Sequence, residues 1–111
     1  MRIIKFRTWD NVDYMSKPFD LKDIQFNAIQ FTDNVKIMQF TGLYDVNGKE
    51  IYEGDIIKHR YFSIKGIAEV RWSDEEACFL AIEPNGARVI LRPNSEIIGN
   101  IWENPELLNE S

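Results

Sequence analysis

The densest run of residues that could do chemistry lies between positions 58 and 65. It interleaves cations with aromatic side chains, namely Lys58, Arg60, Tyr61, Phe62 and Lys65, and Arg71 follows shortly after. Aromatic rings stack on unpaired bases while Lys and Arg neutralise phosphates, so this pattern is typical of proteins that bind single-stranded nucleic acid. In the plainer interpretation, Tyr61 and Phe62 cover the end of a core and the cations stay in water. We favour it because the formal net charge is -5, whereas phosphate binding needs a positive surface.

Residue types that often act in catalysis or bind metals are sparse. His59 is the one histidine and Cys78 the one cysteine of the chain. We expect His59 at the surface or rim of a strand end, and Cys78 buried as a small hydrophobic residue in its apolar run. A nucleophilic cysteine needs a base beside it, and a zinc site needs several nitrogen or sulfur ligands. We therefore assign no catalytic, cofactor-binding or metal-binding residue, and we expect that the protein is not an enzyme and has no cofactor.

The elements that must position these residues are mostly strands. Apolar and polar residues alternate with period two over 4–8 and 67–72, which predicts strands with one buried face. Further strands are expected at 33–42, 56–59, 78–82, 88–92 and 97–102. Glycine beside Asp or Asn predicts tight turns at 45–48, 54–55 and 84–86. Residues 12–35 are left open between helix and strand, with a short helix expected around Leu21 and Ile24.

Together these elements predict a mainly β fold in a single domain that spans residues 1–111. Short strands joined by tight turns favour a small SH3-like or otherwise closed antiparallel β-barrel over residues 56–103. Additional N-terminal strands in residues 1–55 would pack on or extend it. The tail, 104–111, opens with Asn104 as a cap and Pro105 at the first helical position, which predicts a short C-terminal helical turn.

The chain carries no sign of export or of a membrane anchor. Its first residues lack the apolar run of a signal peptide, and no stretch approaches the roughly 20 apolar residues of a membrane helix. A single cysteine cannot form a disulfide within the chain, which fits a reducing compartment. We expect a cytoplasmic protein that does not bind membranes.

Three blocks of sequence resemble the YopX family of bacteriophage and prophage proteins. They are residues 4–10, 38–56 and 98–108, and they follow the order of the family. The resemblance implies a phage or prophage origin and expression in the cytoplasm of a bacterial host. It implies no established activity and no catalytic residue, and it suggests assembly from several copies. Physically, the central block consists of bends at Gly42, Gly48 and Gly54 separated by packing residues, which favours a folding signature. In the functional alternative, the loop at Gly54 and Asp55 borders a recognition groove together with Trp102.

Our leading hypothesis is a phage accessory protein that acts as a non-enzymatic binding module. It would form a homo-oligomer and contact a host or phage protein. Aromatic side chains make good interface anchors, and we assign that role to Trp9, Tyr52 and Trp102. The alternative is a small β-barrel that binds single-stranded nucleic acid through the cations and aromatics of the 58–71 region.

Overall fold

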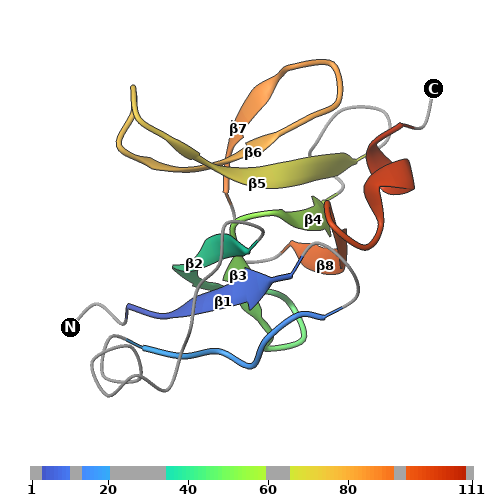
Figure 1. Cartoon of the computed structure of the whole chain (residues 1–111). Helices are drawn as coiled ribbons and strands as arrows, with labels where there is room; N and C mark the ends of the chain where they lie inside the picture. The colour runs from blue at the N-terminus through green and yellow to red at the C-terminus, as the bar shows by residue number, and fades with distance from the viewer. Residues whose placement is uncertain (1–3, 11–13, 21–34, 60–65, 92–94, 110–111) are drawn as a thin grey trace.

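The computed structural model describes residues 4–10, 14–20, 35–59, 66–91 and 95–109. In this part of the chain the strands form two antiparallel sheets (Figure 1). The three-stranded sheet has the order β1-β2-β3, with β1 at Phe6–Trp9, β2 at Lys36–Tyr44 and β3 at Glu50–Tyr52. The five-stranded sheet has the order β7-β6-β5-β4-β8, with β4 at Asp55–Lys58, β5 at Ile67–Ser73, β6 at Cys78–Ile82, β7 at Arg88–Ile90 and β8 at Glu96–Asn100. A 3-10 helix, η1, covers Pro105–Leu108.

The mainly β prediction is confirmed, but a closed barrel is not found in the described residues. Closure of the second half would require β8 to pair with β7. Instead β8 pairs with β4, and β7 pairs with β6, so the five-stranded sheet has two edges. Local turn chemistry favours the meander from β4 to β7, but it does not specify on which side of the sheet the last strand returns.

The predicted turns are confirmed in detail. Gly48 and Gly54 take φ angles of 81° and 85°, in the left-handed region that glycine enters without strain. In the first turn, one carboxylate oxygen of Asp45 accepts hydrogen bonds from the backbone N–H groups of Asn47 (2.8 Å) and Lys49 (2.9 Å). Its other oxygen accepts from the N–H of Ile97 at 3.1 Å. This turn therefore also anchors β8.

Two apolar clusters contain most of the core. The first lies between β3 and the inner face of β4, β5 and β6, and consists of Ile51, Ile57, Ala68, Val70, Ala81 and Leu91. The second lies in the three-stranded sheet and consists of Trp9, Met38, Phe40 and Tyr52. Full burial of each large side chain contributes about 1.5–3 kcal/mol. The first cluster therefore holds the two sheets together, because Ile51 of β3 packs with side chains of β4, β5 and β6.

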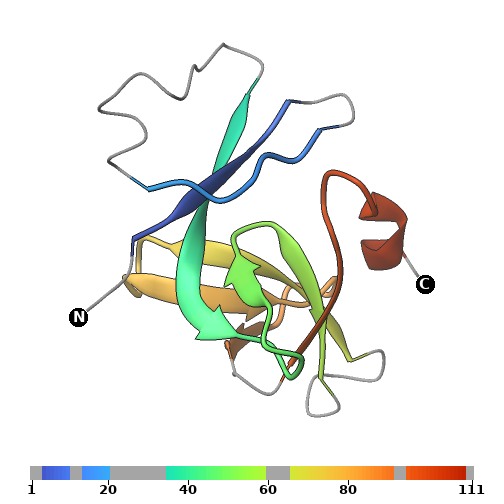
Figure 2. The same cartoon turned by 90° about the horizontal axis from the view of Figure 1, so that it is seen from below.

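The chain after β1 turns back along the outer edge of that strand (Figure 2). The N–H of Phe6 donates to the carbonyl of Phe19 at 2.8 Å, and the N–H of Phe19 donates to the carbonyl of Phe6 at 2.9 Å. Residues 14–20 are therefore extended and cover the edge of β1. The helix expected around residues 21–24 lies outside the described residues.

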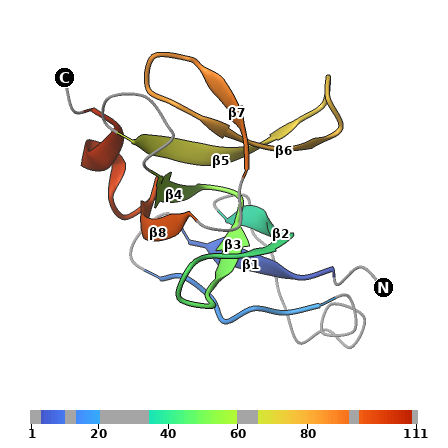
Figure 3. The same ribbon diagram turned by 180° about the vertical axis from the view of Figure 1, so that it is seen from behind.

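The C-terminal turn forms as predicted, and η1 lies beside β5 (Figure 3). Its capping differs from the prediction. Asn104 makes no side-chain capping bond to the helix. Its side-chain oxygen instead accepts from the N–H of Asn100 at 3.2 Å, so it holds the end of β8. No helix among the described residues is long and apolar enough to cross a membrane.

Two predictions of burial are wrong. His59, expected at the surface, is 6% exposed, and Cys78, expected in the core, is exposed. The N–H of His59 donates to the carbonyl of Gly66 at 2.8 Å. The hydrogen bonding between β4 and β5 therefore continues to His59, which lies within the fold. Trp72 alternates in phase with the buried Ala68 and Val70, yet it is 42% exposed. Strand β4 pairs with β5 only from Ile67 to Glu69, so Trp72 lies beyond the end of β4.

Candidate functional site

Two neighbouring hollows lie between β2 and the five-stranded sheet, and Trp72 lines both. We name them together the aromatic groove. The first hollow, of about 290 Å³, is lined by Ile37, Met38, Glu53, Gly54, Glu69, Val70, Arg71, Trp72, Ile101 and Trp102. The second hollow, of about 350 Å³, is lined by Thr41, Leu43, Trp72, Ala77, Cys78, Phe79 and Leu91. Each hollow thus has one wall from β2 and another from β5 or β6.

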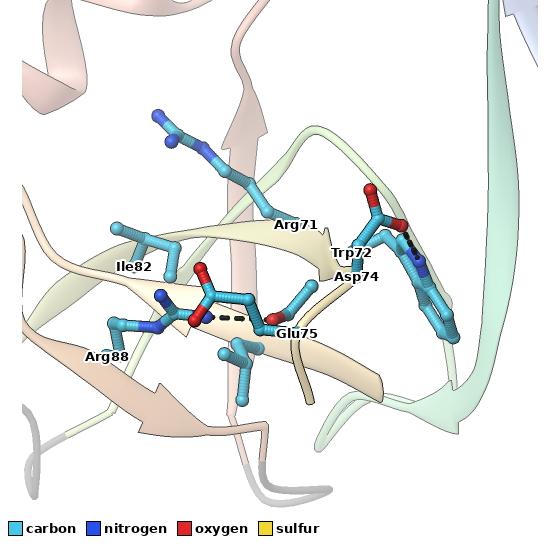
Figure 4. A pocket seen from close by; sticks show the side chains of 8 residues that line it. Arg71, Trp72, Asp74, Glu75, Ile82 and Arg88 are labelled. Atoms are coloured by element: carbon cyan, nitrogen blue, oxygen red, sulfur yellow. Dashed lines mark hydrogen bonds between the residues drawn. The ribbon is translucent and has the colours of Figure 1, made fainter. Parts of the chain in front are cut away.

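Trp72 is the exposed aromatic side chain that the two hollows share. Its ring meets the ring of Phe79 edge to face, with centroids 5.0 Å apart and an interplanar angle of 71°. Its indole N–H donates to a carboxylate oxygen of Asp74 at 2.8 Å (Figure 4). These contacts hold the ring in one position while 42% of the residue stays exposed. An ordered, exposed indole is the kind of side chain that dominates binding energy at protein interfaces.

Trp102 forms part of the first hollow and is positioned by Gly54. Its indole N–H donates to the sulfur of Met38 at 3.0 Å. A β-carbon on Gly54 would lie 3.2 Å from the indole nitrogen, so a larger residue would press against the ring and require it to shift slightly. Gly54 also donates to the carbonyl of Val70 (2.9 Å) and accepts from the N–H of Ile101 (2.8 Å). The turn between β3 and β4 therefore fixes the floor of the hollow.

The charges of the first hollow sum to a negative value. Glu53 and Glu69 carry two negative charges and Arg71 one positive charge, which leaves -1. Arg71 donates to Glu69 at 3.0 Å, and this hydrogen bond raises the pKa of the Arg71 guanidinium. The backbone N–H of Gln39 donates to one oxygen of Glu53 at 2.8 Å. Glu53 is thus oriented by the backbone, without a described cation beside it.

The outer face of the five-stranded sheet carries another hollow, of about 290 Å³, with Arg71, Trp72, Ile82 and Arg88 among its lining residues (Figure 4). Arg88 donates to the hydroxyl of Ser73 at 2.8 Å and pairs with Glu76 at 3.0 Å. Both guanidinium groups of this hollow therefore already have acceptors within the chain. That arrangement leaves little positive charge for a phosphate.

The predicted nucleic-acid cluster is only partly within the described residues. Arg60, Tyr61, Phe62 and Lys65 lie outside them. Lys58 is exposed at the end of β4, where it lies opposite Ile67 of β5. Arg71 lies further along β5, about 13 Å from that point at 3.3 Å per residue. The structure does not bring Lys58 and Arg71 together.

The three predicted interface aromatics have different surroundings. Trp9 and Tyr52 are 6% and 2% exposed, so in this structure neither offers a surface to a partner. The Tyr52 hydroxyl donates to Glu50 at 2.9 Å, and burial raises the pKa of that hydroxyl. Trp102 is half-buried and lines the groove. The important residue that sequence reasoning missed is Trp72. The polar turn directly after it, residues 73–76, is the sequence feature that could have indicated its exposure.

Comparisons with known proteins agree with this fold. A family model described as "YopX protein" matches residues 5–109. The chain is also similar to a solved structure described as "Crystal structure of protein EF1440 from Enterococcus faecalis". That similarity has a TM-score of 0.61 and 28% sequence identity, and covers 97% of this chain and 99% of the other. A search of curated proteins gives no match.

Proposed function

Since this chain belongs to the YopX family, we propose that it is a phage or prophage accessory protein that binds other proteins and catalyses no reaction. It would work in the cytoplasm of the bacterial host and self-associate. The observation that carries the proposal is Trp72, an indole held by Phe79 and Asp74 yet 42% exposed between two hollows. A large apolar side chain ordered before binding loses little conformational entropy on contact.

The shape and charge of the aromatic groove favour one kind of occupant, an extended segment of a partner protein. Its two hollows lie along β2, and each has aliphatic and aromatic lining. Such hollows accept alternate side chains of an extended peptide. The first hollow has a net charge of -1 within a chain of -5. Apolar residues together with a basic residue would complement it.

Self-association is supported by the edge formed by β7. Within the described residues β7 pairs only with β6, and Ile90 on this strand is 72% exposed. An uncovered edge with an apolar side chain invites pairing with another chain. Antiparallel pairing of two β7 strands would give a two-fold symmetric dimer with Ile90 of each copy at the interface. The edge of β1, by contrast, is covered by residues 14–20.

Binding to single-stranded nucleic acid is the second candidate and depends on the sequence cluster around Lys58. The described cations give it little support, because Arg71 and Arg88 already pair with Glu69 and Glu76. The two candidates differ in their salt dependence. Contacts with several phosphates weaken steeply as salt rises, whereas insertion of apolar side chains with one basic residue into the groove weakens much less.

The single cysteine allows a direct test of the groove. Cys78 is an exposed thiol that lines the second hollow. A benzophenone maleimide attached to it will cross-link to whatever protein fills the groove in extracts of phage-infected cells. We expect a specific protein adduct that disappears in the labelled Trp72→Ala variant.

The matched control carries the label at an exposed position that does not line the groove. In the double variant Cys78→Ser, Val46→Cys, the label sits on the β2–β3 turn, at a position where the native Val46 is 56% exposed. This protein should not form the adduct. An adduct of equal yield with and without Trp72, or from the label at position 46, would rule out the groove as the binding site.

A further inference from the structure

We propose that the first hollow of the aromatic groove binds a cationic side chain, the ammonium of Lys or the guanidinium of Arg, from the partner segment. This inference rests on the proposed function and specifies the chemistry of its partner. Trp72 and Trp102 both line the hollow, together with the carboxylates of Glu53 and Glu69. Indole rings attract cations through their electron-rich faces, and carboxylates attract them through charge.

The size of the hollow is sufficient for one long side chain. Its volume is about 290 Å³, at the lower end of the roughly 300–1,000 Å³ of small-molecule pockets. The long methylene stem of Lys or Arg can pack on apolar surface while its charged end meets a polar group. Ile37 and Ile101 supply such a surface within the same hollow.

Glu53 is the group that distinguishes a cationic occupant from an apolar one. One of its oxygens accepts from the N–H of Gln39 at 2.8 Å, and a carboxylate has acceptor capacity for further donors. Any occupant that fills the hollow removes water from this half-buried carboxylate. An apolar occupant would leave the negative charge poorly solvated, whereas an ammonium or guanidinium would compensate for the lost water.

The internal cation of the hollow does not fulfil that role. Arg71 donates to Glu69 at 3.0 Å, so its charge is largely balanced by that carboxylate. The hollow therefore keeps one negative charge in excess, which belongs to Glu53. An anionic occupant would be repelled by it, which also separates this site from a phosphate site.

The test uses amino-acid amides as probes and the three tryptophan indole N–H signals in ¹H–¹⁵N NMR spectra as reporters. The signals are assigned with Trp72→Phe and Trp102→Phe. We expect N-acetyl-lysine amide and N-acetyl-arginine amide to shift the signals of Trp72 and Trp102 in a saturable way. The buried Trp9 should not respond. N-acetyl-norleucine amide, an uncharged analogue of the lysine probe, should bind more weakly.

Glu53→Gln removes the charge but keeps an oxygen that can accept from Gln39, so the fold should persist. We expect the affinity for the lysine probe to fall about fivefold, the effect of losing one partly exposed ion pair. Glu106→Gln is the matched control, because it removes one charge at an exposed position of η1 outside the hollow. It should leave the affinity unchanged.

Two outcomes would overturn the inference: equal binding of the norleucine and lysine probes, or unchanged lysine affinity in Glu53→Gln. If the Cys78 adduct still depended on Trp72 while the cationic probes had no effect, the cationic specificity alone would be wrong. If the adduct did not depend on Trp72, the proposed function itself would be wrong, whatever the probes did.

Discussion

Arg7 on β1 donates a hydrogen bond to the carboxylate of Asp55 at the start of β4, so a nearly buried ion pair joins the two sheets. The side chains are 16% and 2% exposed. The other oxygen of Asp55 accepts from the N–H of Tyr52 at 2.8 Å, and the guanidinium carbon of Arg7 lies 4.5 Å from the centre of the Tyr52 ring. Because β1 pairs with β2 and β4 pairs with β5, this contact links the two sheets that supply the walls of the aromatic groove.

Removing Arg7 should destabilise the protein strongly, and removing its partner as well should restore part of the loss. Arg7→Met leaves the Asp55 carboxylate buried without its cation, which costs about 3 kcal/mol. Adding Asp55→Asn removes the isolated charge and keeps an oxygen that can accept from Tyr52. Urea unfolding of the two single variants and the double variant gives the coupling energy. Strictly additive losses would show that the pair does not act as a unit.

Asp45 should make stability depend on acidic pH. Burial tends to raise the pKa of Asp45, but the N–H groups of Lys49, Ile97 and Asn47 outweigh it and bring the pKa below 3.8. Because the folded value is the lower one, the ionised carboxylate stabilises the fold fully above pH 3.8 and loses this effect as the pH falls through the folded pKa. Asp45→Asn should cost about 1–3 kcal/mol at neutral pH, since its amide cannot accept from Ile97 as well as from Lys49 and Asn47.

The measurement is the difference in unfolding free energy between wild type and Asp45→Asn across the acidic range. Taking the difference cancels the contribution of Asp55, whose pKa is raised by burial in spite of Arg7 and which therefore acts in the opposite direction. The difference should shrink below pH 3.8. A difference that stayed constant would mean that Asp45 stabilises the turn without its charge.

Gly54→Ala should disturb both the backbone and Trp102. Gly54 has a φ of 85°, and an added β-carbon would meet the Trp102 indole nitrogen at 3.2 Å. The backbone strain alone costs about 1–2 kcal/mol. Gly48→Ala is a close control, with a φ of 81° but nothing within 4 Å of the added carbon. Gly54→Ala should lower the melting temperature more and also change tryptophan fluorescence. Equal losses from both variants would show that the ring adapts without strain.

Ile90→Lys should reduce self-association without unfolding the chain. Ile90 is 72% exposed on the β7 edge, and a lysine there opposes edge-to-edge pairing. Analytical ultracentrifugation over a range of concentrations should show dimers or larger species for wild type and monomers for the variant. Val46→Lys, at an exposed position outside any strand, should behave as wild type does. A wild type that stays monomeric at high concentration would disprove the association.

Local sequence was sufficient wherever a short stretch decides its own conformation. The turn at Asp45 and Gly48 follows from a side chain that accepts from nearby N–H groups and a glycine that takes a positive φ. The same holds for the bend at Gly54 and for the helical start at Pro105. Period-two alternation identified β1 and the first part of β5 for a similar reason, since neighbouring residues on a strand face opposite sides.

Tertiary structure decided everything that depends on which segments meet. The pairing of β8 with β4 left the five-stranded sheet open, and a hydrogen bond beyond the end of β4 accompanies the burial of His59. Trp72 lies beyond the residues of β5 that pair with β4 and stays exposed. Arg7 and Asp55 are 48 positions apart, and their contact appears in no local pattern. Burial depends on cover from distant strands, so the residues that line the groove became recognisable only when both of its walls were in place.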